Sequence, residues 1–443
     1  MCILDCLLVS ATIFYMNKAK IWMGVVTSLQ WLYCSVCCYW QVIGGWFSER
    51  VGGKIFLGGG VLVTAVLTLL TPVAARCSVY MLIALRVLEG IGEGVTFPSM
   101  HALLSRWIPP LERTRAVTFI YSGSQLGTVI GMPLSGVLCD HGFAGGWPSV
   151  FYVCGAAGCL WAFAWFALSH SSPSAHPRIS VAELNYIETS LESCETSRKP
   201  PVPWTEIATS LPFWACTAAQ FANNWGVYTL LTCLPKYMHD VLQFDMTQNG
   251  ILSSLPYLAA WLLSIGGGQL ADWLRAPGRL QTGTVWKLFC SAGLLIPGVL
   301  LCTVGFLGCN RFIIVSAVIL AVGCSGLAAS GFGANHLDLA PIYAGTLMGL
   351  ANTLATIPGF LGSQVVGTLT YHQSTRGQWQ KVFYVTTAIY CFGAATFMVF
   401  GSGRHQDWAV VSENVTSDRH NEELEQNLGE WSWSTVRNTS KVN

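Results

Sequence analysis

Long apolar segments recur along this chain, and they constrain its fold more than any other feature. About 20 mostly apolar residues are needed for a helix to cross a bilayer. Such segments lie near residues 24–45, 55–75, 79–104, 116–139, 149–168, 212–236, 249–271, 284–306, 312–334, 343–370 and 382–401. Charged residues make up only 10% of the chain, against roughly 25% in a soluble domain. The sequence therefore predicts an all-α integral membrane protein.

The N-terminus departs from this pattern. Residues 1–16 are apolar but short, are interrupted by Asp5 and lack a basic region before them, which argues against a signal peptide. We expect a short or divergent first helix, which gives 11–12 transmembrane helices in all.

Polar stretches divide the predicted helices into two sets of six. We expect residues 1–168 to form an N-terminal half with helices 1–6, and residues 211–401 to form a C-terminal half with helices 7–12. The stretch 169–210 is rich in Ser, Pro and charge and is predicted to be a cytosolic linker. Residues 402–443 are predicted to be a disordered cytosolic tail. With both ends in the cytosol, the cytoplasmic loops hold more Lys and Arg than the outer loops, as membrane proteins generally do.

The two halves carry a weak internal repeat. The chain reads GGWFSER over residues 44–50 and GGQLADWLR over 267–275. Glycine lets helices approach closely, and an acid favours a helix N-terminus. We therefore expect a structural loop or gate from Gly45, Glu49, Arg50, Asp272 and Arg275.

A second repeat pairs Met100-His101 with Asn335-His336, and each is followed by a proline. Duplicated halves are typical of transporters that move about a central site. For Asn335, His336 and Asp338 we favour a capping or gate role over ligand contact.

Three charged residues lie inside the third apolar segment, where charge is costly and usually functional. At 100° per residue, Glu89 and Glu93 fall within about 60° of Arg86 on one helix face. With both acids ionised the cluster carries one negative charge, and one proton makes it neutral, as a proton-coupled carrier requires. A static ion pair that holds two helices together is the alternative.

Several strings resemble one known family. They include LRVLEGIGEGVTFP (85–98), IPPLER (108–113), LSSLPY (252–257) and NHLDLAP (335–341). These strings are similar to sialin-like members of the anion transporter family of the major facilitator superfamily. That family also holds the vesicular glutamate transporters and the sodium–phosphate cotransporters.

The resemblance implies a major facilitator fold and roles for particular residues. Arg86, Glu89 and Glu93 would couple protons, and Asn224, Tyr228 and His101 would bind substrate. Helix–helix hydrogen bonding competes with this role for Asn224 and Tyr228, and a gate position competes for His101. The family's first-helix arginine has no counterpart before Arg50, so either the N-terminus is incomplete or alternative, or anions bind weakly.

These observations favour a proton-coupled symporter of small organic anions, such as sialic acid or acidic sugars and amino acids. A potential- or sodium-driven glutamate or phosphate carrier and a non-transporting paralogue stay open. Enzyme motifs are absent from the sequence, and we expect no metal, cofactor or nucleic-acid partner. The expected partners are the anion, a proton and the lipid bilayer, for a monomer in a lysosomal or vesicular membrane or the plasma membrane.

Overall fold

Helices joined by short connections form the whole described part of the chain. The computed structural model describes residues 39–191, 201–243, 246–276, 279–304, 306, 311–370 and 375–409. The predicted short first helix therefore lies outside the described residues, as does the chain beyond residue 409.

The first set of helices begins with a helix over residues 39–51. It continues with α3 (Gly53–Cys77), α4 (Val79–Gly94), α5 (Thr96–Trp107), α6 (Arg113–His141) and α7 (Trp147–Leu168). We call these helices the first half.

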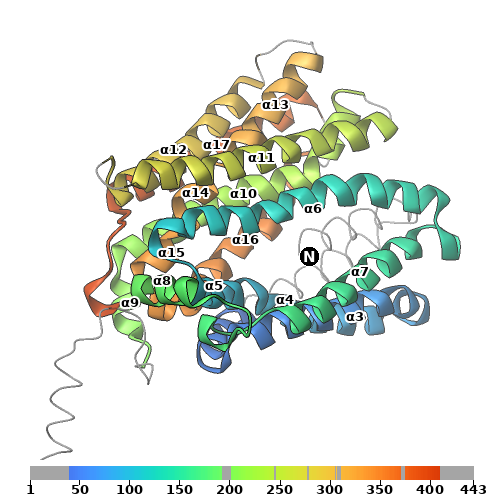
Figure 1. The fold of residues 1–443 in the computed structure, drawn as a ribbon. Helices are drawn as coiled ribbons and strands as arrows, with labels where there is room; N and C mark the ends of the chain where they lie inside the picture. The colour runs from blue at the N-terminus through green and yellow to red at the C-terminus, as the bar shows by residue number, and fades with distance from the viewer. Residues whose placement is uncertain are drawn as a thin grey trace, which may run out of the picture.

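The second half comprises α10 (Leu211–Asp240), α11 (Met246–Arg275), α12 (Thr282–Val304), α13 (Arg311–Ser325), α14 (Ala328–Phe332), α15 (Asn335–Leu339), α16 (Ala344–Thr370) and α17 (Arg376–Phe400). Between the halves lie the short helices α8 (Val181–Leu191) and α9 (Trp204–Thr209). Helices α8, α9 and α15 gather at one end of the bundle, on the left of Figure 1, which we call the linker end.

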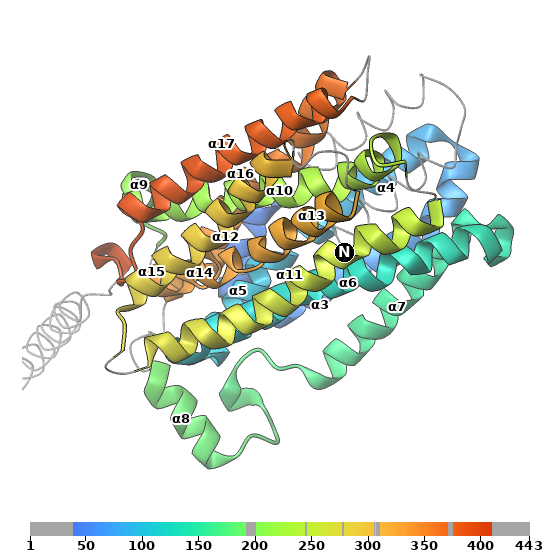
Figure 2. The same ribbon diagram turned by 90° about the horizontal axis from the view of Figure 1, so that it is seen from above.

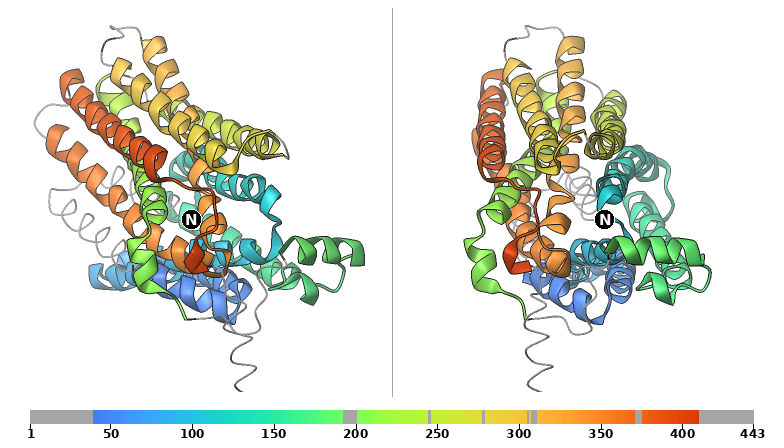
Figure 3. Two further views of the ribbon diagram at one scale, coloured as in Figure 1. Left: turned by 90° about the vertical axis from the view of Figure 1, so that its left-hand side faces the viewer. Right: turned by 60° about the vertical axis from the view of Figure 1, so that its left-hand side comes forward.

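The halves meet along two helix pairs, in which α6 packs against α11 and α5 packs against α16 (Figures 1 and 2). Helices α3 and α17 lie far apart on the outside of the bundle (Figure 3). The helices of these pairs, together with the helix over 39–51 and α15, carry the polar contacts between the halves.

Two predicted spans are interrupted in the structure. The segment near 79–104 divides into α4 and α5 at Val95. Pro98 has no N–H to donate to the Gly94 carbonyl four residues earlier, which breaks the helix there. The segment near 312–334 divides into α13 and α14 at Gly326, whose backbone packs so closely on α11 that a Cβ would clash with the Ala260 carbonyl.

Five helical segments of the described residues are long and apolar enough to cross a membrane, by length and composition: Gly53–Cys77, Trp147–Leu168, Thr282–Val304, Arg376–Phe400 and Arg311–Leu339, which comprises α13, α14 and α15. The other predicted spans, where the structure describes them, are helical but more polar. Helix α10, for example, buries Gln220, and α16 buries Asn352 and Thr356. Polar side chains between helices are expected where the helices face a polar pathway.

The chain after α17 stays on the bundle for several residues. Asn335 Nδ2 donates to the Ser402 carbonyl over 3.1 Å, and the Gln406 N–H donates to the Leu339 carbonyl over 3.0 Å. Ala409 is buried against the same region. Residues 402–409, the described start of the predicted tail, therefore pack on α15.

Candidate functional site

An ion pair is buried in α4. Arg86 Nη1 lies 2.7 Å from Glu89 Oε2, and the Glu89 side chain is fully buried. Thr71 of α3 donates a hydrogen bond of 3.3 Å to the other carboxylate oxygen. The carboxylate is thus held between two helices by an arginine and a hydroxyl. Charge-assisted pairs of this kind are among the stronger polar contacts in proteins.

Glu93 lies one turn further along the same helix and is only 7% exposed. Its spacing from Arg86 puts it on the face that bears Glu89. A short run of buried glycines accompanies these charges, and Gly92 packs against Gly60 of α3 so closely that added Cβ atoms would clash. Small residues therefore bring α3 against the charged face of α4.

The GGxxx-acid repeat of the first half reaches across to the second half. Glu49 accepts a hydrogen bond of 2.7 Å from the Thr346 N–H and one of 3.0 Å from its hydroxyl. Thr346 lies in the first turn of α16, where free N–H groups and the helix dipole attract an anion. Gly45 abuts the same turn, since a Cβ there would collide with the Gly345 carbonyl. Arg50 instead stacks over Trp46 at 3.9 Å.

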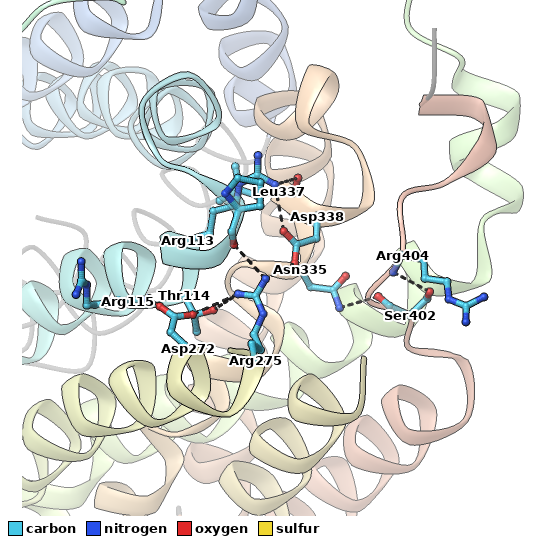
Figure 4. Close-up of polar contacts among 11 residues, drawn as sticks. Arg113, Thr114, Arg115, Asp272, Arg275, Asn335, Leu337, Asp338, Ser402 and Arg404 are labelled. Carbon is cyan, nitrogen blue, oxygen red and sulfur yellow. Dashed lines mark hydrogen bonds and ion pairs between the residues drawn. The ribbon is translucent and has the colours of Figure 1, made fainter. Parts of the chain in front are cut away.

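The repeat of the second half makes the equivalent contact in the opposite direction. Asp272 of α11 accepts a hydrogen bond of 2.7 Å from the Arg115 N–H in the first turn of α6 (Figure 4). Gly268 abuts Thr118 of α6. Each acid of the repeat therefore caps a helix of the other half, and the sequence repeat becomes a pair of reciprocal contacts at the linker end.

A buried charge network joins the halves beside these caps. Arg113 of α6 binds Asp338 of α15 at 3.1 Å and the Leu337 carbonyl at 3.1 Å. Arg275 of α11 lies 3.7 Å from Asp338 and 3.2 Å from Asp272, and it donates to the Thr114 hydroxyl over 2.9 Å (Figure 4). All three charged side chains of the Arg113–Asp338–Arg275 network are less than 10% exposed.

The histidines of the second repeat face each other between the halves. The rings of His101 and His336 are 6.2 Å apart, and both residues are at most 1% exposed. Asn335, which precedes His336, bonds the chain after α17 instead. We call these contacts of Glu49, Asp272, Asp338, His101 and His336 with the opposite half the linker-end gate; in this structure they join the two halves at that end.

The predicted substrate residues of α10 lie against α16. Asn224 Nδ2 donates a hydrogen bond of 2.8 Å to the Ala355 carbonyl. One turn on, the Tyr228 ring packs beside Gly359. The helix–helix contact that competes with a substrate role is thus present for both residues.

The sequence pattern does not mark Arg113, Thr346 or Tyr121, although all three contact the residues of the linker-end gate: Arg113 contacts Asp338, Thr346 contacts Glu49, and the Tyr121 hydroxyl lies 3.5 Å from His101 Nε2. Arg113 is part of the string at 108–113 that resembles the family, and this resemblance is the sequence signal that could have indicated a role for its charge. Thr346 acts partly through its backbone N–H, which no sequence pattern marks.

Comparison with known proteins identifies the family to which the chain belongs. The family model described as "Major Facilitator Superfamily" matches residues 11–363. The chain belongs to the major facilitator superfamily. The fold agrees with that of the major facilitator superfamily proton:xylose symporter XylE bound to 6-bromo-6-deoxy-D-glucose. That structure superposes with a TM-score of 0.69 at 13% identity, over 91% of this chain and 93% of the symporter.

Similar proteins of the superfamily are transporters. Sialin of Homo sapiens is 48% identical over 84% of this chain and 74% of its own length. A putative inorganic phosphate cotransporter of Drosophila ananassae is 42% identical over 84% of this chain and 78% of its own length. Vesicular glutamate transporter 3 of Danio rerio is 41% identical over 86% of this chain and 64% of its own length.

The predicted major facilitator fold and the predicted sialin-like family are confirmed by these matches. This member of the superfamily is a multi-pass membrane transporter and is not an enzyme.

Proposed function

We propose that this chain is a proton-coupled symporter of small organic anions, with sialic acid as the leading candidate substrate. The observation that carries the proposal is the buried Arg86–Glu89 pair, 2.7 Å apart, with Glu93 buried on the same helix face. The similarity to sialin supports the substrate class.

The charge of this cluster changes with one proton. With both acids ionised, one arginine faces two carboxylates, and protonation of either acid releases part of the attraction on Arg86. A charge at the centre of a membrane helix costs about 2.5–3.5 kcal/mol when unpaired. Loss of one pairing therefore alters the balance between conformations by an amount comparable to typical coupling energies.

In the proposed cycle the linker end faces the cytosol. The reciprocal caps of Glu49 and Asp272 close that end, so substrate and proton enter from the opposite, acidic side. Protonation of Glu89 or Glu93 frees Arg86 to receive the substrate carboxylate. Separation of the caps then opens the linker end, where both leave.

Asn224 and Tyr228 would border the substrate, with their contacts to α16 rearranging as it binds. For His101 we propose a role in the linker-end gate ahead of a role in substrate binding, because its ring lies among the contacts of the gate. We propose a lysosomal or vesicular membrane, in keeping with the similarity to sialin and to a vesicular transporter, and we expect a monomer.

A potential- or sodium-driven carrier of glutamate or phosphate is the second candidate. The similarity to a vesicular glutamate transporter and to a putative phosphate cotransporter favours it. Uptake that survives a collapsed pH gradient but follows sodium or voltage would identify this mechanism.

The deciding experiment measures uptake of radiolabelled sialic acid, with glutamate and phosphate in parallel, into cells that display this chain at the surface. Acid-stimulated sialic acid uptake supports the proposal. Absent uptake of every anion, with surface expression verified, would support a non-transporting protein.

A further inference from the structure

The linker-end gate contains two ionisable groups that the proposed coupling does not use. His101 of α5 and His336 of α15 come from matching positions of the two repeats and lie with ring centres 6.2 Å apart. Opening the gate must separate them, because one belongs to each half.

The side chains described in contact with the two rings are uncharged. His101 Nε2 lies 3.5 Å from the Tyr121 hydroxyl, and His336 Nε2 lies 3.6 Å from Cys216 Sγ. His101 Nδ1 is buried with no hydrogen-bond partner among the described residues. The Phe213 ring lies 6.5 Å from that of His336.

The nearby acids are already engaged. Asp338 binds Arg113 and Arg275, and Glu49 binds Thr346. Other titratable groups in this region include Tyr121, Cys216 and Cys290, with Asp272 and His405 beside the Arg113–Asp338–Arg275 network. The contacts described for the two rings include no carboxylate.

A proton on either ring would therefore be poorly accommodated while the gate is closed. A buried charge without a partner costs several kcal/mol, and a second proton on the neighbouring ring, 6.2 Å away, would add repulsion. Once the halves separate, water can solvate the imidazolium. Protonation thus stabilises the open gate relative to the closed one.

We propose that His101 and His336 form a proton-sensitive lock on the linker-end gate, which closes only when both imidazoles are neutral. The lock is distinct from the Arg86–Glu89–Glu93 cluster, since His101 lies in α5, eight residues beyond Glu93 and past the helix break at Val95. That the proton comes from the cytosol rests on the proposed function. The lock itself depends only on the contacts between the halves.

Cys216 offers a native reporter of the gate. It is completely buried beside His336 and lies near Tyr121 of the first half, so separation of the halves removes the part of its cover that the first half provides. Cys77 at the end of α3 is exposed and records how the intrinsic reactivity of thiols changes with pH. The ratio of Cys216 to Cys77 labelling by N-ethylmaleimide, mapped by peptide mass spectrometry, therefore follows gate opening in the purified full chain.

Between pH 7.5 and 5.5 we expect this ratio to rise by up to about tenfold for each histidine, because an imidazole free in water titrates near pH 6.5. His101→Gln or His336→Gln should each reduce the rise, and the double variant should abolish it. Glu93→Gln should retain the rise, which separates failure of the lock from failure of the proposed coupling.

A ratio in the unaltered protein that does not change with pH would overturn the proposal. So would a rise that persists in the double histidine variant, or one that vanishes in Glu93→Gln. The first of these results is measured on the unaltered protein, so the proposal can be refuted even if a variant fails to fold.

Discussion

Asp338→Asn should open the linker-end gate more than any other single conservative change. Asp338 lies between two buried arginines, 3.1 Å from Arg113 and 3.7 Å from Arg275. Removing one partner of a buried ion pair costs about 3–5 kcal/mol. The lower value applies here, because Arg113 keeps the Leu337 carbonyl and Arg275 keeps Asp272.

When the gate opens, water solvates both arginines, so this cost falls on the closed state. A loss of about 3 kcal/mol lowers the closed-to-open ratio by roughly 100-fold, since 1.4 kcal/mol is a factor of ten. The assay is the labelling rate of Cys216 relative to Cys77 at pH 7.5. Adding Arg113→Gln should recover part of the loss, because it removes a stranded charge.

Asp140→Asn is the matched control, since Asp140 is an exposed carboxylate near the opposite end of α6. It should leave the Cys216 rate within about twofold, the range of ordinary surface substitutions. The reasoning is refuted if Asp338→Asn changes the rate less than threefold, or if Asp140→Asn changes it equally.

Three further outcomes follow from the same contacts. Glu49→Gln should destabilise the closed gate by roughly 0.3–2 kcal/mol, the contribution of an acid at a helix N-terminus, and so raise Cys216 labelling less than Asp338→Asn does. An increase as large as that of Asp338→Asn would contradict the capping role of Glu49. Gly45→Ala should destabilise the closed gate by about 1–3 kcal/mol through overpacking and so raise Cys216 labelling. Gly59→Ala, where an added Cβ meets no atom, should leave Cys216 labelling unchanged. Equal Cys216 labelling in the two variants would contradict the close approach of Gly45 to α16. Burial chiefly lowers the pKa of His405, with Arg113 acting in the same direction and Asp338 opposing. Residues 402–409 should therefore pack fully above the ordinary histidine pKa of about 6.5 and loosen as pH falls below it. The loosening should appear as a lower protection factor for the Gln406 amide, that is, exchange relative to the intrinsic rate at each pH, and should be absent in His405→Gln.

The helices were largely predictable because apolar length is a local property of the sequence. The segment near 55–75 corresponds to α3, and the segment near 149–168 to α7. The division at Val95 follows from Pro98, which is visible in the sequence, but whether a proline bends or breaks a helix depends on its neighbours.

The gate was predictable only in part. The repeat marked Glu49 and Asp272 as a pair, yet that each caps a helix of the opposite half is a property of the packed halves. The partner of Asp338 could not be found by spacing, because Arg113 lies 225 positions away. The meeting of His101 with His336 is likewise set by the approach of α5 to α15, which no periodicity encodes.

The charged cluster of α4 was the most accessible feature, since three charges on one helix face stand out in an apolar segment. The structure adds Thr71 of α3 as a hydrogen-bond donor to Glu89. Sequence patterns could not supply this contact, because it depends on the close packing of α3 on α4.

The most direct test of proton coupling compares sialic acid uptake by the unaltered protein and by Glu93→Gln at acidic and neutral outside pH, with surface expression matched. We predict acid-stimulated uptake in the unaltered protein and loss of that stimulation in the variant. Stimulation of equal size in both would contradict the account, because the buried acids of α4 would then not carry the coupled proton.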